Sequence, residues 1–301
     1  MDDRRSAAVI GLGSMGAGMA RALHRSGIRT AGTDVNAKAL QAMERDGIAT
    51  HRTPAEAAGM ADIAIVVVVN AAQVEAVLFG EDGAVPAMQP GSVVVCCATI
   101  APERAKGFAA RAGEHGILYL DAPISGGAEK AAAGKLTVMA SGPRQAFDAA
   151  APALKAMAET VYDLGADVGI GSSFKMVNQH LAGIHIAAAC EAITFARSLG
   201  LDIAKVFEVI TKSAGNSWMF ENRIPHVLAG DYSPKSSVSI FTKDLGIVSD
   251  MARANKFPAS MAGTALQLFL MCEAVGMGAD DDASVARLLA GICKLDLPPE
   301  A

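Results

Sequence analysis

The sequence predicts an α/β protein in which a Rossmann-type, doubly wound parallel sheet is followed by an all-α C-terminal domain. Over roughly the first 160 residues, short β-branched runs alternate with alanine-rich helical stretches. A glycine-rich turn follows the first of these runs, and after Gly165 the helical patterns continue without a convincing strand. We therefore expect two domains, a Rossmann-type domain at residues 1–165 and an all-helical domain at residues 166–301.

The predicted strands are short apolar runs bounded by turn residues. They are Ala7–Ile10, Thr30–Thr33, Ile63–Val69, Ser92–Cys96, Leu118–Ala122 and Leu136–Ser141. The predicted helices between them include Gly16–Arg25, Ala37–Asp46, Ala71–Leu78 and Pro102–Glu114. The run Ile63–Val69 does not alternate with polar residues, which is typical of a strand covered by helices on both faces. We expect all six strands to join one parallel sheet.

The C-terminal half opens with a long helical pattern from about Phe174 to Leu199 that is apolar nearly all round. Such a pattern predicts a buried helix. We expect this helix to join the two domains, with the active site in the cleft between them. Near the end of the chain, the acidic run Asp280-Asp281-Asp282 predicts a solvated loop before a helix.

The composition excludes several classes of protein. The chain has 301 residues, 51% hydrophobic residues and a mean hydropathy of +0.32, but its most apolar run is far shorter than the roughly 18 residues of a spanning helix. A net charge of −5 argues against a nucleic-acid partner. Five cysteines without zinc-like spacing, and a segment Met1–Arg5 that leads straight into a predicted strand, favour a cytoplasmic protein. No cluster has metal-ligand spacing, so we expect no metal.

The first candidate site is the glycine-rich turn, which lies between a predicted strand and a predicted helix. Glycines there allow a tight turn and let the backbone approach a pyrophosphate at the helix N-terminus. A G-x-G-x-x-G pattern alone is a weak signal, but this position predicts that the turn binds a dinucleotide. The cofactor-binding residues are then Gly11, Leu12, Gly13, Ser14, Met15 and Gly16.

Asp34 ends the second predicted strand, 18 residues beyond the last glycine, about where a carboxylate would accept the ribose 2′-hydroxyl. The alternative is an ordinary turn residue or helix N-cap. A carboxylate would repel a 2′-phosphate, and the neighbours Thr33, Val35 and Asn36 supply no arginine to hold one. We therefore predict NAD as the cofactor, in preference to NADP.

Three further segments carry polar groups where ligands bind in such folds. Thr99 follows a predicted strand and should lie at the carboxyl edge of the sheet. The segment Asp121–Gly127 also ends a strand and offers a hydroxyl and backbone N–H groups that suit a carboxylate. Lys175 and Asn178 share one face near the start of the long helix.

These motifs resemble those of the β-hydroxyacid dehydrogenase family. The matching segments are the glycine-rich turn with Met19, Asp121–Gly127, Gly171-x-x-x-Lys175-x-x-Asn178 and Lys243-Asp244-Leu245. They occur in the family's order and cover the chain from residue 7 to about residue 250. The resemblance implies an NAD-dependent dehydrogenase that acts on the CH–OH group of a small hydroxy acid. It also implies a homodimer or homotetramer.

The resemblance also implies roles for single residues. Lys175 matches the family's catalytic general acid/base, and Asn178 its substrate-orienting asparagine. The other implied contacts are Ser125, Gly126 and Gly127 to the substrate carboxylate, Thr99 beside the nicotinamide, and Lys243 over both cofactor and substrate. Two positions depart from the pattern. Gln179 replaces a second asparagine and is expected to alter substrate contacts, whereas Ser141-Gly142 replaces a glycine pair and is expected to be structural.

The chemistry fits these residue types. Oxidation of a secondary alcohol requires removal of the hydroxyl proton, and a lysine on a largely apolar helix could have its pKa lowered by desolvation towards the working pH. The alternative for Lys175 is a helix-end lysine that reaches into solvent.

The sequence leaves several hydroxy acids as candidate substrates. The polar and aromatic segment Gly215–Arg223, with the single Trp218, could line a pocket for a polyol acid or could simply pack. Together with the segment Ile240–Val248, it favours L-threonate, oxidised at carbon 2, within the family resemblance. The alternatives are 3-hydroxyisobutyrate and tartronate semialdehyde, or a noncatalytic dinucleotide sensor on the same scaffold.

Overall fold

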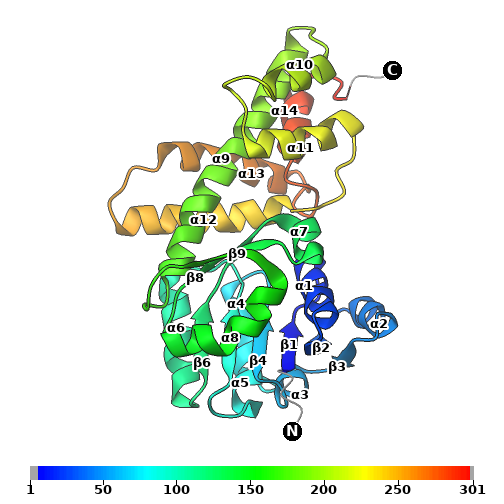
Figure 1. Cartoon of the computed structure of the whole chain (residues 1–301). Helices are drawn as coiled ribbons and strands as arrows, with labels where there is room; N and C mark the ends of the chain where they lie inside the picture. The colour runs from blue at the N-terminus through cyan, green and yellow to red at the C-terminus, as the bar shows by residue number, and fades with distance from the viewer. Residues whose placement is uncertain (1–5, 299–301) are drawn as a thin grey trace. The chain divides into compact units, whose positions relative to one another are not determined.

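The computed structural model describes residues 6–298 (Figure 1). It divides into two compact units, Met1–Lys175 and Met176–Ala301. The segment Met1–Arg5, from which we expect no signal peptide, lies outside the described residues.

The N-terminal unit is built on a six-stranded parallel sheet with the order β3-β2-β1-β4-β5-β6. Its strands are β1 (Ser6–Ile10), β2 (Arg29–Thr33), β3 (Ala49–His51), β4 (Ile63–Val66), β5 (Val93–Cys96) and β6 (Leu118–Asp121). The strand order reverses between β1 and β4, which makes this the switch point where open α/β sheets bind ligands. The predicted Rossmann-type class is confirmed.

Helices cover both faces of this sheet (Figure 1). They are α1 (Ser14–Arg25), α2 (Ala37–Arg45), α3 (Pro54–Ala58), α4 (Ala71–Phe79), α5 (Ala84–Ala87), α6 (Pro102–Glu114), α7 (Gly127–Ala133) and α8 (Arg144–Met157). Alternate strand residues enter two cores. Ile63 and Ile65 pack with α1 and α8, whereas Ala64 and Val66 pack with α3, α4 and α6. Double coverage explains why these strands contain no polar alternation.

The sixth predicted strand does not join the parallel sheet, so that part of the prediction is wrong. It forms β8 (Leu136–Ala140) in a separate three-stranded sheet, between β7 (Ile124–Ser125) and β9 (Ala158–Asp163). β7 follows β6 after two residues, far fewer than the dozen that a parallel crossover needs. β7 pairs antiparallel with β8, and β9 then adds in parallel. The prediction also extended β4 to Val69, whereas the strand ends at Val66.

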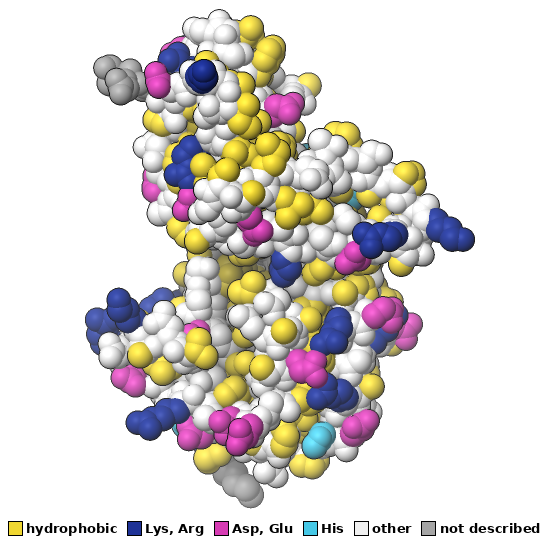
Figure 2. Space-filling model, turned by 180° about the vertical axis from the view of Figure 1, so that it is seen from behind, with side chains coloured by type: hydrophobic (Ala, Val, Ile, Leu, Met, Phe, Trp, Pro, Cys, Tyr) yellow, Lys and Arg dark blue, Asp and Glu magenta, His cyan; other side chains and the backbone are white. Residues whose placement is uncertain are grey.

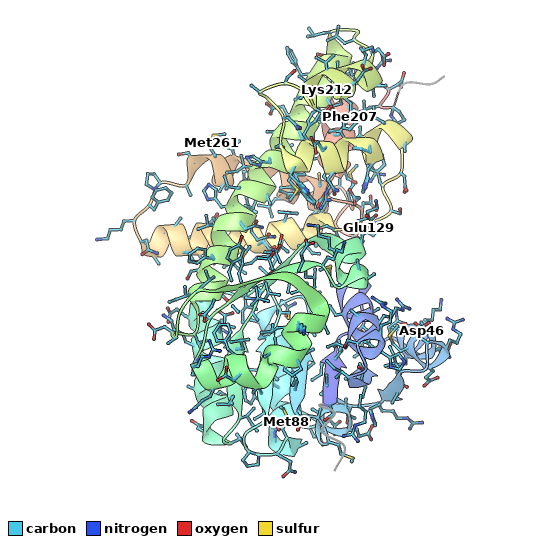
Figure 3. The ribbon with its side chains drawn as sticks, viewed as in Figure 1. Asp46, Met88, Glu129, Phe207, Lys212 and Met261 are labelled. Carbon is cyan, nitrogen blue, oxygen red and sulfur yellow. The ribbon has the colours of Figure 1, made fainter. Side chains whose placement is uncertain are left out.

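The C-terminal unit is helical, as predicted. Its elements are the continuation of α9 (Ile170–Ser198), then α10 (Ile203–Ile210), α11 (Trp218–Ala229), α12 (Val238–Ala254), α13 (Ser260–Ala274) and α14 (Ser284–Cys293). Their buried faces share one core that includes Ile186, Phe220 and Phe269. Phe207, labelled in Figure 3, stacks on Phe220 with ring centroids 5.9 Å apart. Within residues 6–298, no helix combines the length and apolarity that a membrane span requires.

Two predictions for this half need correction. The long helix α9 is not buried all round, because Phe174, Val177, Leu181 and Phe195 are exposed. The acidic run is not a solvated loop either, since Asp281 and Asp282 are both 0% exposed. The burial of these two carboxylates depends on partners that are distant in sequence.

Candidate active site

The glycine-rich turn connects β1 to α1, as the motif predicts. Gly11 has a φ of +96°, and a Cβ on it would lie 2.4 Å from the carbonyl oxygen of Val67. A Cβ on Gly16 would lie 1.8 Å from the carbonyl oxygen of Gly11. Both glycines are therefore required by the turn itself. A Cβ on Gly13 would meet nothing within 4 Å, so the protein's own packing does not explain this glycine, whereas close approach of a phosphate would.

The rest of the turn starts the helix. Ser14 and Met15 form the first residues of α1 after Gly13, which occupies the N-cap position without a side-chain cap. Backbone N–H groups at such a helix start carry partial positive charge and favour an anion. The turn therefore offers the space and the donors that a pyrophosphate requires.

Asp34 lies just beyond β2 and is tied to the glycine-rich turn. Its Oδ2 accepts a hydrogen bond from the Leu12 N–H at 2.6 Å, and its Oδ1 accepts one from the Asn36 N–H at 2.7 Å. The N-cap of α2 is Asn36 and not Asp34. Each carboxylate oxygen has a second lone pair, so Asp34 could also accept ribose hydroxyls while it orders the turn.

Thr99 lies three residues beyond the end of β5 and is half-buried. Gly11 follows β1 and Asp34 follows β2 in the same way. The strands are parallel, so these residues all lie at the carboxyl edge of the sheet, where the sequence predicts them. This edge is the ligand-binding edge of open α/β sheets.

Asp121 anchors the start of α9. It is fully buried, and its Oδ2 accepts hydrogen bonds from the backbone N–H groups of Gly169 at 3.0 Å and Ser172 at 2.8 Å. Its Oδ1 accepts one from the Ser172 hydroxyl at 2.7 Å. Burial raises the pKa of Asp121, although these donors lower it. The Ser141 hydroxyl accepts from the Gly171 N–H at 2.9 Å, which gives Ser141 the structural role that we expected.

The segment after β6 contains the predicted carboxylate-binding residues. Ser125 ends β7, and Gly126 and Gly127 have φ values of +135° and +76°, in the region that favours glycine. A Cβ on Gly126 would also approach the Lys130 side chain at 2.9 Å. The two glycines open α7, so their geometry is fixed by the turn. Ser125 is half-buried beside them.

Lys175 lies in the second turn of α9 and is 7% exposed. It is therefore not the solvent-reaching helix-end lysine of the alternative interpretation. Asn178 follows one turn later and is half-buried. Its Nδ2 donates to the Oε1 of Gln179 at 2.9 Å.

Lys243 and Asp244 lie on α12 in the C-terminal unit. The Lys243 Nζ is 2.8 Å from the Asp244 Oδ1, and the Gln179 Nε2 donates to the Asp244 Oδ2 at 2.5 Å. In this unit the structure therefore brings together Asn178, Gln179, Asp244 and Lys243. Trp218 begins α11 and is 56% exposed, so it does not pack in the core.

Two family models match the chain. One, described as the NAD binding domain of 6-phosphogluconate dehydrogenase, matches residues 6–165. The other, described as NAD-binding of NADP-dependent 3-hydroxyisobutyrate dehydrogenase, matches residues 169–289.

Relatives align over nearly the whole chain. A protein of Cupriavidus necator named L-threonate dehydrogenase is 48% identical over 99% of both chains, and one of the same name from Escherichia coli K12 is 46% identical over 94% of both. The chain belongs to the β-hydroxyacid dehydrogenase family. A crystal structure from Salmonella typhimurium described as 3-hydroxyisobutyrate dehydrogenase agrees with the fold, with a TM-score of 0.91 at 45% identity over 94% of this chain and 99% of that one.

Membership confirms the predictions of a dehydrogenase and of NAD as cofactor. The family model that matches residues 6–165 covers the glycine-rich turn, Asp34, Thr99 and Ser125–Gly127. The second carries Lys175, Asn178 and Lys243.

Sequence reasoning missed three supporting residues of this dehydrogenase. The sequence indicates Asp121 only as part of a substrate-binding segment, but its carboxylate holds the start of the helix that carries Lys175. For Gln179 the sequence predicts altered substrate contacts but not the hydrogen bond to Asp244, and Asp244 is indicated only as the partner of Lys243 in a motif. A buried acid followed by small residues at a strand end gives no signal that distinguishes a helix anchor from a ligand contact.

Proposed function

We propose that this protein oxidises L-threonate at carbon 2 to the corresponding 2-oxo four-carbon acid (2-dehydro-L-erythronate), with NAD as cofactor. The observation that carries the proposal is the 48% identity, over 99% of both chains, with a protein named L-threonate dehydrogenase. The catabolism of sugar acids would require such a step.

The cofactor proposal rests on the fit of the turn and of Asp34. The space at Gly13 and the N–H groups at the start of α1 would hold the pyrophosphate, and Asp34 would hold the adenine ribose. When bound, NAD accepts the hydride from the substrate. Because a carboxylate at Asp34 would repel a 2′-phosphate, we expect a lower KM for NAD than for NADP. A lower KM for NADP would exclude this role of Asp34.

The proton-transfer proposal assigns Lys175 as the general base. Its Nζ would take the proton of the substrate hydroxyl during oxidation, and would return it to the carbonyl oxygen in the reverse reaction. Ser125 and the N–H groups of Gly126 and Gly127 would hold the substrate carboxylate. Asn178 would orient the substrate, while Thr99 would lie beside the nicotinamide and Lys243 would close over cofactor and substrate.

Lys175→Ala tests this assignment. We expect turnover to fall by about two orders of magnitude or more, as for the loss of a general base, while NAD still binds and quenches protein fluorescence. The control is Lys212→Ala, because Lys212 is exposed in the turn just after α10 (Figure 3). Near-normal turnover of the Lys175 variant would remove this residue from the mechanism.

A substrate screen tests the proposed acid. NAD reduction is measured with L-threonate, D-erythronate, D-glycerate and 3-hydroxyisobutyrate at equal concentration. We expect the highest kcat/KM with L-threonate. If the protein oxidises 3-hydroxyisobutyrate but neither L-threonate nor D-erythronate, L-threonate is not the substrate. If NAD binds but none of the acids is oxidised, a dinucleotide sensor is favoured.

The assembly proposal is a homodimer or homotetramer. The C-terminal unit exposes many hydrophobic side chains (Figure 2), among them Leu181 and Phe195 on α9. Met261 at the start of α13 is 65% exposed (Figure 3). Large exposed apolar patches mark interaction sites, and we propose that a second copy of this chain covers them. A monomer by light scattering at micromolar concentration would contradict this.

A cytoplasmic location is the remaining proposal. The five cysteines are free, and all but Cys293 are buried. Burial raises the pKa of Cys96 to about 11, so this thiol is held in its unreactive form. Free thiols of this kind are typical of a reducing compartment.

A further inference from the structure

A continuous set of polar contacts joins α9 to α12 within the C-terminal unit. The Asn178 Nδ2 donates to the Gln179 Oε1 at 2.9 Å, and the Gln179 Nε2 donates to the Asp244 Oδ2 at 2.5 Å. The second oxygen of Asp244 is 2.8 Å from the Lys243 Nζ. Gln179 and Asp244 are 7% and 1% exposed. We call these four side chains the amide relay.

The chemistry of the four side chains determines which group donates and which accepts in each hydrogen bond of the relay. A carboxylate paired with a lysine ammonium accepts hydrogen bonds and does not donate them. Gln179 must therefore turn its NH₂ group towards Asp244, which leaves its carbonyl oxygen facing Asn178. Asn178 must then present its own NH₂ group to Gln179. The carbonyl oxygen of Asn178 then points away from Gln179, and its chemistry suits a hydrogen bond from a ligand hydroxyl.

The relay lies on a close helix–helix contact. A Cβ on Gly183 would lie 2.8 Å from a methyl carbon of Leu245, so α9 and α12 approach closely one turn after Gln179. Because packing fixes the spacing between α9 and α12, Gln179 on α9 and Asp244 on α12 are held at a set distance. A glutamine spans that gap here, and an asparagine side chain would be one methylene shorter.

We propose that Gln179 and Asp244 are positioning residues that lock the Asn178 amide with its carbonyl oxygen towards the substrate. The inference rests on the proposed function, because it assumes that Asn178 contacts a hydroxy acid. A carbonyl oxygen accepts a hydrogen bond from a hydroxyl group and is repelled by a carboxylate. The locked amide therefore selects acids that carry a further hydroxyl, such as L-threonate, over their deoxy analogues.

Gln179→Met tests the selection, because methionine has nearly the length of glutamine but makes neither hydrogen bond. Kinetics are measured with L-threonate and with 2-hydroxybutanoate of the same configuration at carbon 2, which lacks the further hydroxyls. We expect the variant to lower kcat/KM for L-threonate by about ten- to a hundredfold, mainly through KM, as for a misplaced positioning group. Its kcat/KM for 2-hydroxybutanoate should stay within about twofold. The matched control is Gln267→Met, at an exposed position on α13.

A double-mutant cycle with Asn178→Ala separates positioning from general damage. If Gln179 acts through Asn178, the double variant should lose no more than Asn178→Ala alone, because coupled residues are not additive. Losses that multiply, or an equal loss on both acids in Gln179→Met, would overturn the relay. If the wild-type protein oxidises another hydroxy acid and not L-threonate, the proposed function is wrong. The same double-mutant cycle, measured with that acid, still tests whether Gln179 acts through Asn178.

Discussion

Each unit of this protein buries a carboxylate completely, but the two units stabilise it differently. In the N-terminal unit, Asp121 is held by uncharged donors, the two backbone N–H groups and the hydroxyl at the start of α9. In the C-terminal unit, Asp282 is held by a cation. The Arg223 Nε and Nη2 donate to its two oxygens at 2.6 and 3.0 Å.

The remaining acids of the C-terminal run extend the second arrangement. Asp281 lies 3.0 Å from the Nδ1 of His226, and it accepts hydrogen bonds from the backbone N–H groups of Lys235 and Ala283. Asp280 pairs with Arg287. These contacts join α11 to the segment that precedes α12 and to the start of α14. The contacts of Asp281 and Asp282 therefore connect helices to one another, whereas Asp121 connects the end of a strand to one helix terminus.

The comparison shows that a buried acid can serve as a helix cap or as a link between helices, with different consequences for stability. Burial raises the pKa of both carboxyls, that of Asp282 to about 6. A cap distributes its charge over several weak donors, so the loss of one is tolerable. A link depends mainly on one guanidinium, and its removal leaves a buried charge without a cation beside it.

The largest expected effect is the loss of this guanidinium. Arg223→Met should lower the free energy of unfolding by about 3–5 kcal/mol, because Asp282 would then be buried unpaired. Urea denaturation measures the change. The control is Arg253→Met, whose partner Asp250 is 3.4 Å away and exposed, where the change should stay below about 1 kcal/mol. The double variant Arg223→Met/Asp282→Leu should recover much of the loss, and a double variant as unstable as the single one would contradict this account.

The pH dependence of stability gives the next effect. Because the pKa of Asp282 is about 6 in the folded protein and about 4 in an unfolded chain, the folded state retains the proton longer. The stabilising contribution is complete below about pH 4 and is lost as the pH rises towards 6. Relative to Asp282→Asn, the wild-type protein should therefore lose up to about 3 kcal/mol between these values. Urea denaturation from pH 4 to 7 measures it, and a constant difference between the two proteins would exclude the raised pKa.

Much of the fold could be predicted because local patterns decide it. The unbroken apolar run at Ile63–Val66 indicated double coverage, and the glycine-rich turn set the start of α1. The separate sheet of β7, β8 and β9 could not be found in this way. Strand β8 has the same local pattern as a parallel strand, and only its pairing with β7 and β9 assigns it to another sheet.

The positions of motif residues could be predicted, as at Gly13 and Asp34, which lie at the carboxyl edge of the parallel sheet. Side-chain contacts could not be predicted where the partner is remote. Three consecutive acids predict a solvated loop, so the burial of Asp282 could not be foreseen. Its partner Arg223 lies 59 residues away. Gln179 and Asp244 are 65 residues apart. Pairings of this kind follow from the packing of helices, which one sequence does not encode in any local pattern.

The smallest effect on stability is expected at the cap. Asp121→Asn keeps one acceptor oxygen for the two backbone N–H groups at the start of α9 but places its NH₂ group against the Ser172 hydroxyl, which loses its acceptor. This loss should cost about 1–2 kcal/mol. The matched control is Asp163→Asn, whose carboxylate accepts from the Gly165 N–H at the surface and should change little. Because Ser172 lies three residues before Lys175, a loosened helix start should also lower kcat by about tenfold while the KM for NAD is unchanged. A loss of several kcal/mol in this variant, as large as that of Arg223→Met, would show that the cap and the ion pair are equivalent and that the comparison between the two units is wrong.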